Sequence, residues 1–265
     1  MKRILFTLYL LLLSTGLAHA WQELEAGLWL REFSCPEEIV SQSCRIHVLR
    51  IDLSLFKPIL CMASKDGGRA LLQEWAARYD MVAAINASMY MPDMRTSTGY
   101  MKSRGMENNG YVNPGYGAFL LFEPLVPDLP QVQMIDKNHC PQWRDLLGQY
   151  GSCIQNFRLV SKEQKNVWYR DSEPVSIAAV GVNSAGELLF IHSRSLLSVR
   201  HFTDVLLSLP LDISMTMYVE GGVDASLYIR TPKSKQIFSG TNSQTFWIEN
   251  RNRYLPNVLG IIRRK

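Results

Sequence analysis

Two short segments of this sequence place side chains capable of chemistry next to small residues. The first is Asn86-Ala87-Ser88-Met89-Tyr90, and the second is Glu220-Gly221-Gly222. A carboxyl group held at the end of a strand can transfer protons or stabilise positive charge. The glycines after Glu220 permit positive φ and leave backbone N–H groups open to an anion. The second segment therefore fits either a catalytic site or a tight turn that carries a solvated acid.

Common catalytic and metal-binding signatures are missing from the sequence. It contains no G-x-S-x-G, no H-E-x-x-H, no P-loop and no C-x-x-C. Beyond the N-terminal segment, histidines stand at positions 47, 139, 192 and 201, and none forms a recognised ligand pair. We expect no metal site, and the sequence does not identify a cofactor. His47 lies in an alternating segment and is expected to be structural, while His192 and His201 are candidates to line a cleft.

Both segments follow apolar runs that have the length of buried strands, Met81–Ile85 and Ile213–Val219. Ligand groups converge on loops at the carboxyl ends of strands, so these two strands are expected to position the site. The polar stretch 86–115 shows neither a helical nor a strand period and is expected to be a functional loop. Further strands are expected over 46–55, 116–122, 177–182, 187–193, 227–229, 245–248 and 258–262, and helices over 70–79 and 198–209.

These elements predict an α+β fold with more strand than helix, built from a mixed twisted sheet or sheets and a few packed helices. Nothing resembles a linker or a repeat, so residues 21–265 are expected to form a single domain.

The N-terminus has the pattern of a cleavable secretory signal over residues 1–20. Lys2 and Arg3 precede the apolar run Ile4–Leu13, and Ala18-His19-Ala20 places small residues at a cleavage site. No other apolar stretch reaches the length of a membrane span, so we expect no membrane insertion after cleavage. The mature protein is expected to be periplasmic or secreted.

The cysteines suggest disulfide pairs, and the net charge limits the classes of binding partner. The pairs Cys35–Cys44 and Cys140–Cys153 are candidate disulfides in an oxidising compartment, which would leave Cys61 free, although spacing alone does not fix the connectivity. The net charge is +4, and no Lys/Arg cluster is dense enough to follow phosphates along a duplex. We therefore expect no nucleic-acid partner.

The two segments, together with Gly99-Tyr100 and Ser226-Leu227-Tyr228, resemble the phosphodiester glycosidase family. Similarity extends over roughly residues 46–250, with Glu220 where that family usually has aspartate. The resemblance implies hydrolysis of the bond between a sugar anomeric carbon and a phosphate oxygen. It also implies a glycan or small-molecule substrate.

The resemblance implies roles for individual residues. Glu220 would stabilise charge at the anomeric carbon or activate water, and Asn86 would orient a sugar hydroxyl or water. The other expected substrate-binding residues are Gly221, Gly222, Tyr90, Gly99, Lys102, Arg104 and Ser226. Lys102 and Arg104 would bind the phosphate, with Arg95 and Arg200 as further candidates. A second carboxylate would come from Asp93, Glu107 or Asp224.

Two other interpretations stay open. The chain could be a non-catalytic protein of the cell envelope that keeps the fold and binds a glycan or wall polymer. It could also be a partner-binding module that uses the Met- and Tyr-rich loop 86–116, in which case a contiguous exposed apolar patch is expected.

Overall fold

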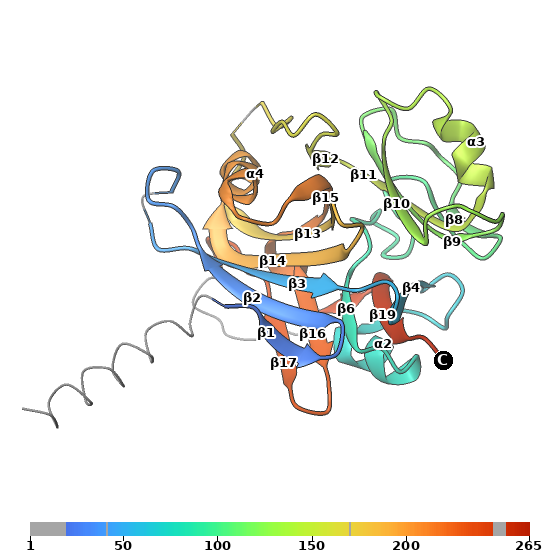
Figure 1. The fold of residues 1–265 in the computed structure, drawn as a ribbon, viewed down its shortest axis with the longest axis horizontal. Helices are drawn as coiled ribbons and strands as arrows, with labels where there is room; N and C mark the ends of the chain where they lie inside the picture. Colours follow the sequence, from blue (N-terminus) through green and yellow to red (C-terminus); the bar gives the residue numbers. More distant parts are fainter. Residues whose placement is uncertain (1–19, 41, 170, 246–252) are drawn as a thin grey trace, which may run out of the picture.

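The computed structural model describes residues 20–40, 42–169, 171–245 and 253–265 (Figure 1). The strands, in chain order, are β1 (Gln22–Glu25), β2 (Leu28–Ser34), β3 (Arg45–Ile51), β4 (Phe56–Met62), β5 (Ala70–Leu71), β6 (Ala83–Asn86), β7 (Met101–Ser103), β8 (Met106–Asn109), β9 (Ala118–Pro124), β10 (Val132–Asp136), β11 (Tyr150–Asn156), β12 (Arg158–Val160), β13 (Val175–Asn183), β14 (Leu188–Leu197), β15 (Ile213–Gly221), β16 (Ser226–Arg230), β17 (Lys235–Ser239), β18 (Tyr254–Leu255) and β19 (Asn257–Arg263). The helices are α2 (Leu72–Arg78), α3 (Trp143–Gly148), α4 (Val199–Ser208) and the short 3₁₀ helix η2 (Gly222–Asp224).

The fold is dominated by sheets, as expected, with few helices. A seven-stranded sheet has the order β1-β2-β3-β14-β13-β15-β12, and two five-stranded sheets have the orders β17-β16-β6-β19-β4 and β10-β9-β11-β7-β8. A two-stranded ribbon joins β18 to β5. Every strand pair among the described residues is antiparallel. The expectation of mixed sheets is therefore wrong. Hairpins account for pairs such as β13–β14 and β16–β17, and long-range pairs such as β3–β14 and β6–β19 are antiparallel as well.

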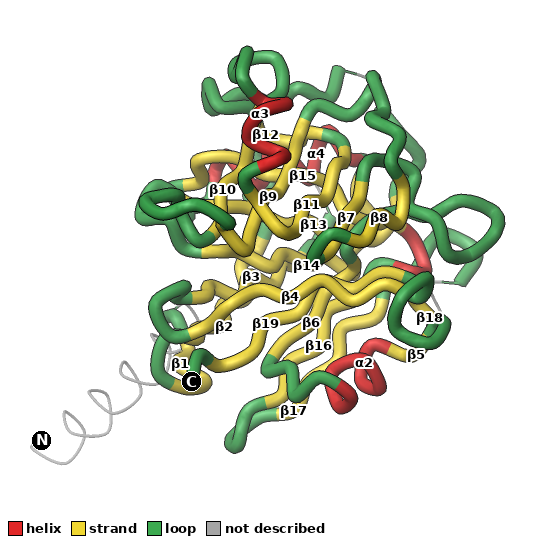
Figure 2. The backbone as a smooth tube through the Cα atoms, turned by 90° about the vertical axis from the view of Figure 1, so that its right-hand side faces the viewer, coloured by secondary structure: helices red, strands yellow, loops and turns green. Residues whose placement is uncertain are grey.

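The main core lies where the three large sheets meet. Phe190 from the seven-stranded sheet, Leu227 from β16 and Leu120 from β9 all belong to one buried apolar cluster. The other face of the seven-stranded sheet packs against α4, and Ile191 and Phe202 lie in that second cluster. Neighbouring residues of β14 thus serve opposite faces, as the pleat requires. Figure 2 shows the β6–β19–β4 sheet lying below the β7–β11 sheet, with α2 at its lower edge.

Several expected elements are confirmed. The hairpin of β13 and β14, the strand β15 and the helix α4 lie where hydrophobic periodicity predicts them. Ser198 caps α4, its Oγ accepting a hydrogen bond from the backbone N–H of His201 at 3.2 Å. The predicted helix over 70–79 is α2, preceded by the two residues of β5.

Other expectations need correction. The stretch 86–115 is not wholly irregular, because β7 and β8 lie in it and β7 pairs with β11. The strand expected over 46–55 ends at Ile51, where a turn leads into β4. Oδ1 of Asp52 accepts a hydrogen bond from the backbone N–H of Ser54 and so stabilises this turn. The strand expected over 245–248 and the predicted signal over 1–20 fall almost entirely outside the described residues.

The disulfide predictions divide in the same way. Cys35 and Cys44 are bonded, but Cys140 and Cys153 are separate thiols. Cys153 is fully buried on β11 in the apolar cluster beneath α3, and Cys140 packs against the same cluster, so both act as small apolar side chains. Cys61 is free and buried, as expected for the odd cysteine. No helix among the described residues is long and apolar enough to span a membrane.

Candidate active site

The site lies where the chain crosses from the seven-stranded sheet to the sheet that contains β6. Glu220 ends β15, the turn η2 follows, and β16 then runs antiparallel to β6. Asn86 closes this crossing, because its Nδ2 donates to the backbone oxygen of Asp224 at 2.9 Å. Its Oδ1 accepts from the backbone N–H of Ser226 at 2.7 Å. These two bonds tie the end of β6 to the turn that follows β15 and to the start of β16. Figure 1 shows where β6, β15 and β16 lie in the fold.

Glu220 is an acid held in a buried position. Its residue is 8% exposed, and its Oε1 accepts a hydrogen bond from the backbone N–H of Gly221 at 2.9 Å. Burial raises the pKa of Glu220 to about 8 and outweighs the lowering by the Gly221 hydrogen bond, and the negative charge of Asp224 adds a smaller increase. At neutral pH the carboxyl group is therefore mostly protonated. A strongly raised pKa at a strand end is typical of a catalytic acid.

Glycine is required at the two positions after Glu220 for different structural reasons. A Cβ on Gly221 would lie 2.0 Å from the hydroxyl oxygen of Tyr218, so only glycine fits there without movement of that ring. Gly222 has a φ of +65°, in the region that favours glycine, and starts η2. The N–H of Gly221 is directed to Glu220, so the expected oxyanion cradle is already partly occupied by the protein's own carboxyl group.

Asp224 is the second carboxylate that the fold brings to the site. Its Oδ2 accepts from the hydroxyl of Tyr90 at 2.6 Å, and its Oδ1 pairs with Nε of Arg253 at 2.6 Å. The other two candidates have partners within their own loop: Asp93 accepts from Thr96, and Glu107 accepts from Tyr100. Both oxygens of Asp224 are committed, which fits a role in holding Tyr90 and Arg253 in place.

A cavity of about 260 Å³ opens beside this carboxylate. It is lined by Arg69, Tyr90, Met94, Arg253 and Tyr254. Sequence reasoning missed Arg69, Arg253 and Tyr254, because none of them stands in a recognisable motif. They reach the site through the pairing of β18 with β5, a long-range contact that no local pattern indicates.

The basic residues expected to bind phosphate have partners elsewhere. Nζ of Lys102 donates to the backbone oxygen of Leu147, and Arg104 pairs with Glu123 at 2.8 Å. Both belong to the β7–β11 region and make no recorded contact with the crossing at residues 220–226. Arg95 is exposed, and Arg200 is exposed on α4.

The remaining predicted residues divide between the site and its surroundings. Ser226 is buried at the crossing, and its Oγ donates to the backbone oxygen of Asp224 at 3.0 Å. Gly99 lies in the segment after β6, packed against the ring of Tyr116. Asn86 is 1% exposed and bonds through both side-chain atoms to backbone groups, so its geometry favours positioning over direct contact with substrate.

One of the histidines singled out in the sequence, His192, contacts the crossing. His192 is fully buried, with Nε2 3.3 Å from the backbone oxygen of Ala225. Burial lowers its pKa to about 3, so the ring is neutral. It faces His47 across the β14–β3 pair, and Nε2 of His47 lies 2.9 Å from Oε2 of Glu32. His201 lies on α4 near its cap, with Nδ1 3.1 Å from Oγ of Ser198.

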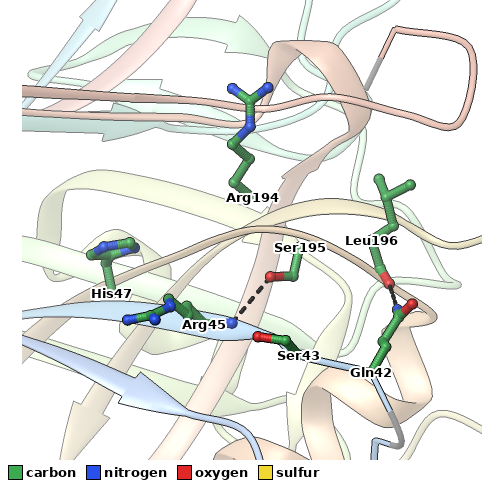
Figure 3. Close-up of a pocket in the computed structure, with 7 residues that line it drawn as sticks. All are labelled: Gln42, Ser43, Arg45, His47, Arg194, Ser195 and Leu196. Atoms are coloured by element: carbon green, nitrogen blue, oxygen red, sulfur yellow. Dashed lines mark hydrogen bonds between the residues drawn. The ribbon is translucent and has the colours of Figure 1, made fainter. Parts of the chain in front are cut away.

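A larger cavity of about 490 Å³ lies along β3 and the end of β14. Figure 3 shows the lining residues Gln42, Ser43, Arg45, His47, Arg194, Ser195 and Leu196. The backbone N–H of Arg45 donates to Oγ of Ser195 at 3.0 Å, and Nε2 of Gln42 donates to the backbone oxygen of Leu196 at 2.8 Å. Two arginines line this cavity, and the side chain of Arg45 pairs with Glu32. No group of three or more His, Cys, Asp or Glu side chains in the described part of the chain is arranged to hold a metal ion.

Comparison with known proteins identifies the class. The family model described as phosphodiester glycosidase matches residues 79–262, which contain both strand ends and η2. The chain therefore belongs to the phosphodiester glycosidase family. A comparison with curated protein sequences gave no significant match.

Solved structures with the same fold include the catalytic domain of zebrafish N-acetylglucosamine-1-phosphodiester alpha-N-acetylglucosaminidase, auto-inhibited by pro-peptide. The identity is 13%, the TM-score is 0.61, and the match covers 93% of this chain and 87% of that one. A hypothetical protein from Synechocystis gives 12% identity and a TM-score of 0.61, covering 91% and 63% of the two chains. A putative exported protein from Burkholderia pseudomallei gives 10% and 0.51, covering 83% and 74%. At these identities the likeness establishes the fold alone.

Proposed function

We propose that this protein is an exported hydrolase that cleaves the bond between a sugar and phosphate in sugar-1-phosphodiesters of envelope or extracellular glycans. The observation that carries the proposal is the buried carboxyl group of Glu220 near Asp224, whose own carboxylate binds Tyr90 and Arg253. Membership of the phosphodiester glycosidase family and the fold of the zebrafish enzyme support it. The signal pattern and the Cys35–Cys44 disulfide support an oxidising, extracytoplasmic location.

The protonation state of Glu220 favours a role as proton donor. As the bond from the anomeric carbon to the phosphate oxygen breaks, Glu220 gives its proton to that oxygen. The ionised carboxylate then takes a proton from the water that adds to the anomeric carbon. The products are the free sugar and a phosphomonoester, and Glu220 returns to its starting state. From the sequence, Glu220 is expected to act in its ionised form. The proposed mechanism starts from the protonated form because burial raises the pKa of Glu220.

The test is turnover of a panel of sugar-1-phosphodiesters that includes an N-acetylglucosamine-1-phosphodiester. Wild-type protein should release free sugar from at least one member. Glu220→Gln keeps the size of the side chain but has no acidic proton, and it should reduce kcat by about 100-fold or more. Glu23→Gln, an exposed change on β1, is the matched control and should leave kcat unchanged. Undiminished activity of Glu220→Gln would overturn the assignment.

A second candidate function is binding of an anionic glycan or wall polymer without turnover. The 490 Å³ cavity lined by Arg45 and Arg194 favours it, because this cavity offers two cationic side chains to an anion and its lining does not include Glu220 or Asp224. Under this alternative, wild-type protein binds members of the panel and releases no sugar. Arg45→Ala should then weaken binding while Glu220→Gln leaves it unchanged.

A further inference from the structure

We infer that the 260 Å³ cavity is the subsite for the phosphate and the leaving group of the diester, with Arg69 binding the phosphate and Tyr254 contacting a ring-bearing leaving group. This inference rests on the proposed function and names the residues that would set substrate choice. Neither Arg69 nor Tyr254 belongs to the two strand ends that carry the family resemblance.

The ribbon of β5 and β18 fixes both side chains. Tyr254 pairs with Leu71, and Leu255 pairs with Ala70. Arg69 stands two residues before Leu71, and alternate residues of a strand share a face, so Arg69 and Tyr254 lie on the same face. Both line the cavity. The ring nitrogen of buried Trp75 donates to the backbone oxygen of Leu255 at 2.9 Å, which anchors the ribbon to α2. This wall of the cavity is therefore formed by a hydrogen-bonded β-ribbon anchored to α2, and not by an unsupported loop.

The charges around the cavity match a diester. Arg253 is paired with Asp224 at 2.6 Å, so its charge is largely balanced within the protein. Arg69 makes no salt bridge or side-chain hydrogen bond with any other residue that the structure describes. Among the described residues that line the cavity, Arg69 thus supplies the one guanidinium without a charged partner in the protein. A phosphodiester carries a single negative charge, whereas a phosphomonoester approaches two near neutral pH. The site is therefore matched to the substrate's charge before cleavage, and the monoester product brings an additional negative charge.

The size and the walls of the cavity indicate which part of the substrate it takes. Its volume of about 260 Å³ is below the roughly 300–1,000 Å³ of pockets that hold whole ligands. It therefore accommodates a part of the substrate beside Tyr90 and Arg253, the two residues that bind the carboxylate of Asp224. Tyr254 is 56% exposed and Met94 lies beside it, which gives the outer wall an aromatic and apolar character. A flat ring with a polar hydroxyl at its edge suits the face of a sugar or an aromatic group.

The experiment compares two diesters of the same sugar, one with a phenyl and one with a methyl leaving group. Arg69→Ala should raise KM for both by about tenfold or more, since it removes a charge-assisted contact made in the bound substrate. Tyr254→Ala should raise KM for the phenyl diester several times more than for the methyl diester. Arg69→Lys should recover part of the loss. Arg144→Ala and Tyr111→Ala, both exposed and away from the cavity lining, are the controls and should leave KM unchanged.

The outcomes separate this inference from the proposed function. If Glu220→Gln abolishes turnover but Arg69→Ala leaves KM unchanged, the inference fails and the function stands. Equilibrium dialysis of the same two diesters against wild type, Arg69→Ala and Tyr254→Ala covers the case without turnover. Binding that depends on Arg69 and Tyr254 but gives no product would support the subsite and overturn the hydrolase. A wild type that neither binds nor cleaves would overturn both.

Discussion

The hydroxyl of Tyr90 donates a 2.6 Å hydrogen bond to Oδ2 of Asp224, which lies 134 positions later in the chain. This contact ties the segment after β6 to the turn between β15 and β16. Because Arg253 occupies the other oxygen of Asp224, three parts of the chain meet on one carboxylate. The negative charge of Asp224 also contributes to the raised pKa of Glu220, so this arrangement influences the proposed proton donor.

Removal of the Tyr90 hydroxyl should weaken this junction. Tyr90→Phe leaves the ring but removes a donor to a charged group, a bond typically worth about 1.5–3 kcal/mol. We expect the free energy of unfolding, measured by urea denaturation, to fall by about that amount. Tyr111→Phe on an exposed ring is the matched control and should change it by less than about 0.5 kcal/mol. Equal stability of the two variants would show that the bond contributes nothing.

The raised pKa of Glu220 predicts a pH dependence of stability. Between the ordinary value of 4.5 and the folded value of about 8, the folded state holds a proton that the unfolded state has released. The contribution of Glu220 to the free energy of unfolding is thus fully present below pH 4.5 and is lost as pH rises through this range. The limiting slope from this group is about 1.4 kcal/mol per pH unit. Glu220→Gln should remove that component, as urea titrations at a series of pH values would reveal. A variant with the same pH slope as wild type would contradict the buried, protonated acid.

The same protonation state predicts the pH profile of turnover. A proton donor loses function as it ionises, so kcat/KM should fall as pH rises through about 8. A rise of kcat/KM through that pH would instead indicate that the ionised form of Glu220 is active. That is the form expected from the sequence, in which Glu220 stabilises positive charge or activates water. Steady-state kinetics over this range, with Glu23→Gln measured alongside, distinguishes the two.

The close packing at Gly221 can be tested by paired substitutions. Gly221 has extended backbone angles that alanine tolerates, so the obstacle to a side chain is the Tyr218 hydroxyl 2.0 Å from the position of a Cβ. Gly221→Ala should destabilise the fold by about 1–3 kcal/mol. Tyr218→Phe removes that hydroxyl, and the double variant should recover much of the loss. Additive effects in the double-mutant cycle would argue against this contact.

The cysteine assignment predicts a labelling pattern. In the folded protein an alkylating reagent should reach half-buried Cys140, whereas burial protects Cys61 and Cys153 and raises the pKa of the Cys61 thiol to about 12. Unfolding without reduction should expose the free thiols of all three, as counted by mass spectrometry. If only one thiol then reacts, Cys140 and Cys153 are bonded and the original sequence prediction holds.

The parts of the fold that the sequence predicts are those with local signals. The strand before Glu220 has an apolar period and ends at glycines, and α4 has its Ser198 cap and a following proline. These signals require only neighbouring residues, so they can be read without knowledge of the fold. The contact of Asn86 with the turn after Glu220 could also be anticipated, because both residues stand at the carboxyl ends of strands.

The parts that escaped prediction depend on long-range pairing. Arg69 and Arg253 meet only because β5 pairs with β18, and nothing in either segment indicates this partner. Lys102 has the expected charge but lies on β7, where its ammonium group bonds to Leu147 in place of a ligand. The protonation of Glu220 likewise depends on how deeply the fold buries it. The local sequence, a glutamate followed by two glycines, does not indicate that burial.

In the proposed reaction water attacks the sugar and not the phosphorus, and Glu220 is the proton donor. Hydrolysis of a sugar-1-phosphodiester in ¹⁸O-labelled water, followed by mass spectrometry of both products, shows which bond is broken. The label should enter the anomeric hydroxyl of the released sugar, the phosphomonoester should carry none, and Glu220→Gln should form neither product at a comparable rate. Label in the phosphate would show that the phosphorus–oxygen bond is broken and would rule out attack at the sugar.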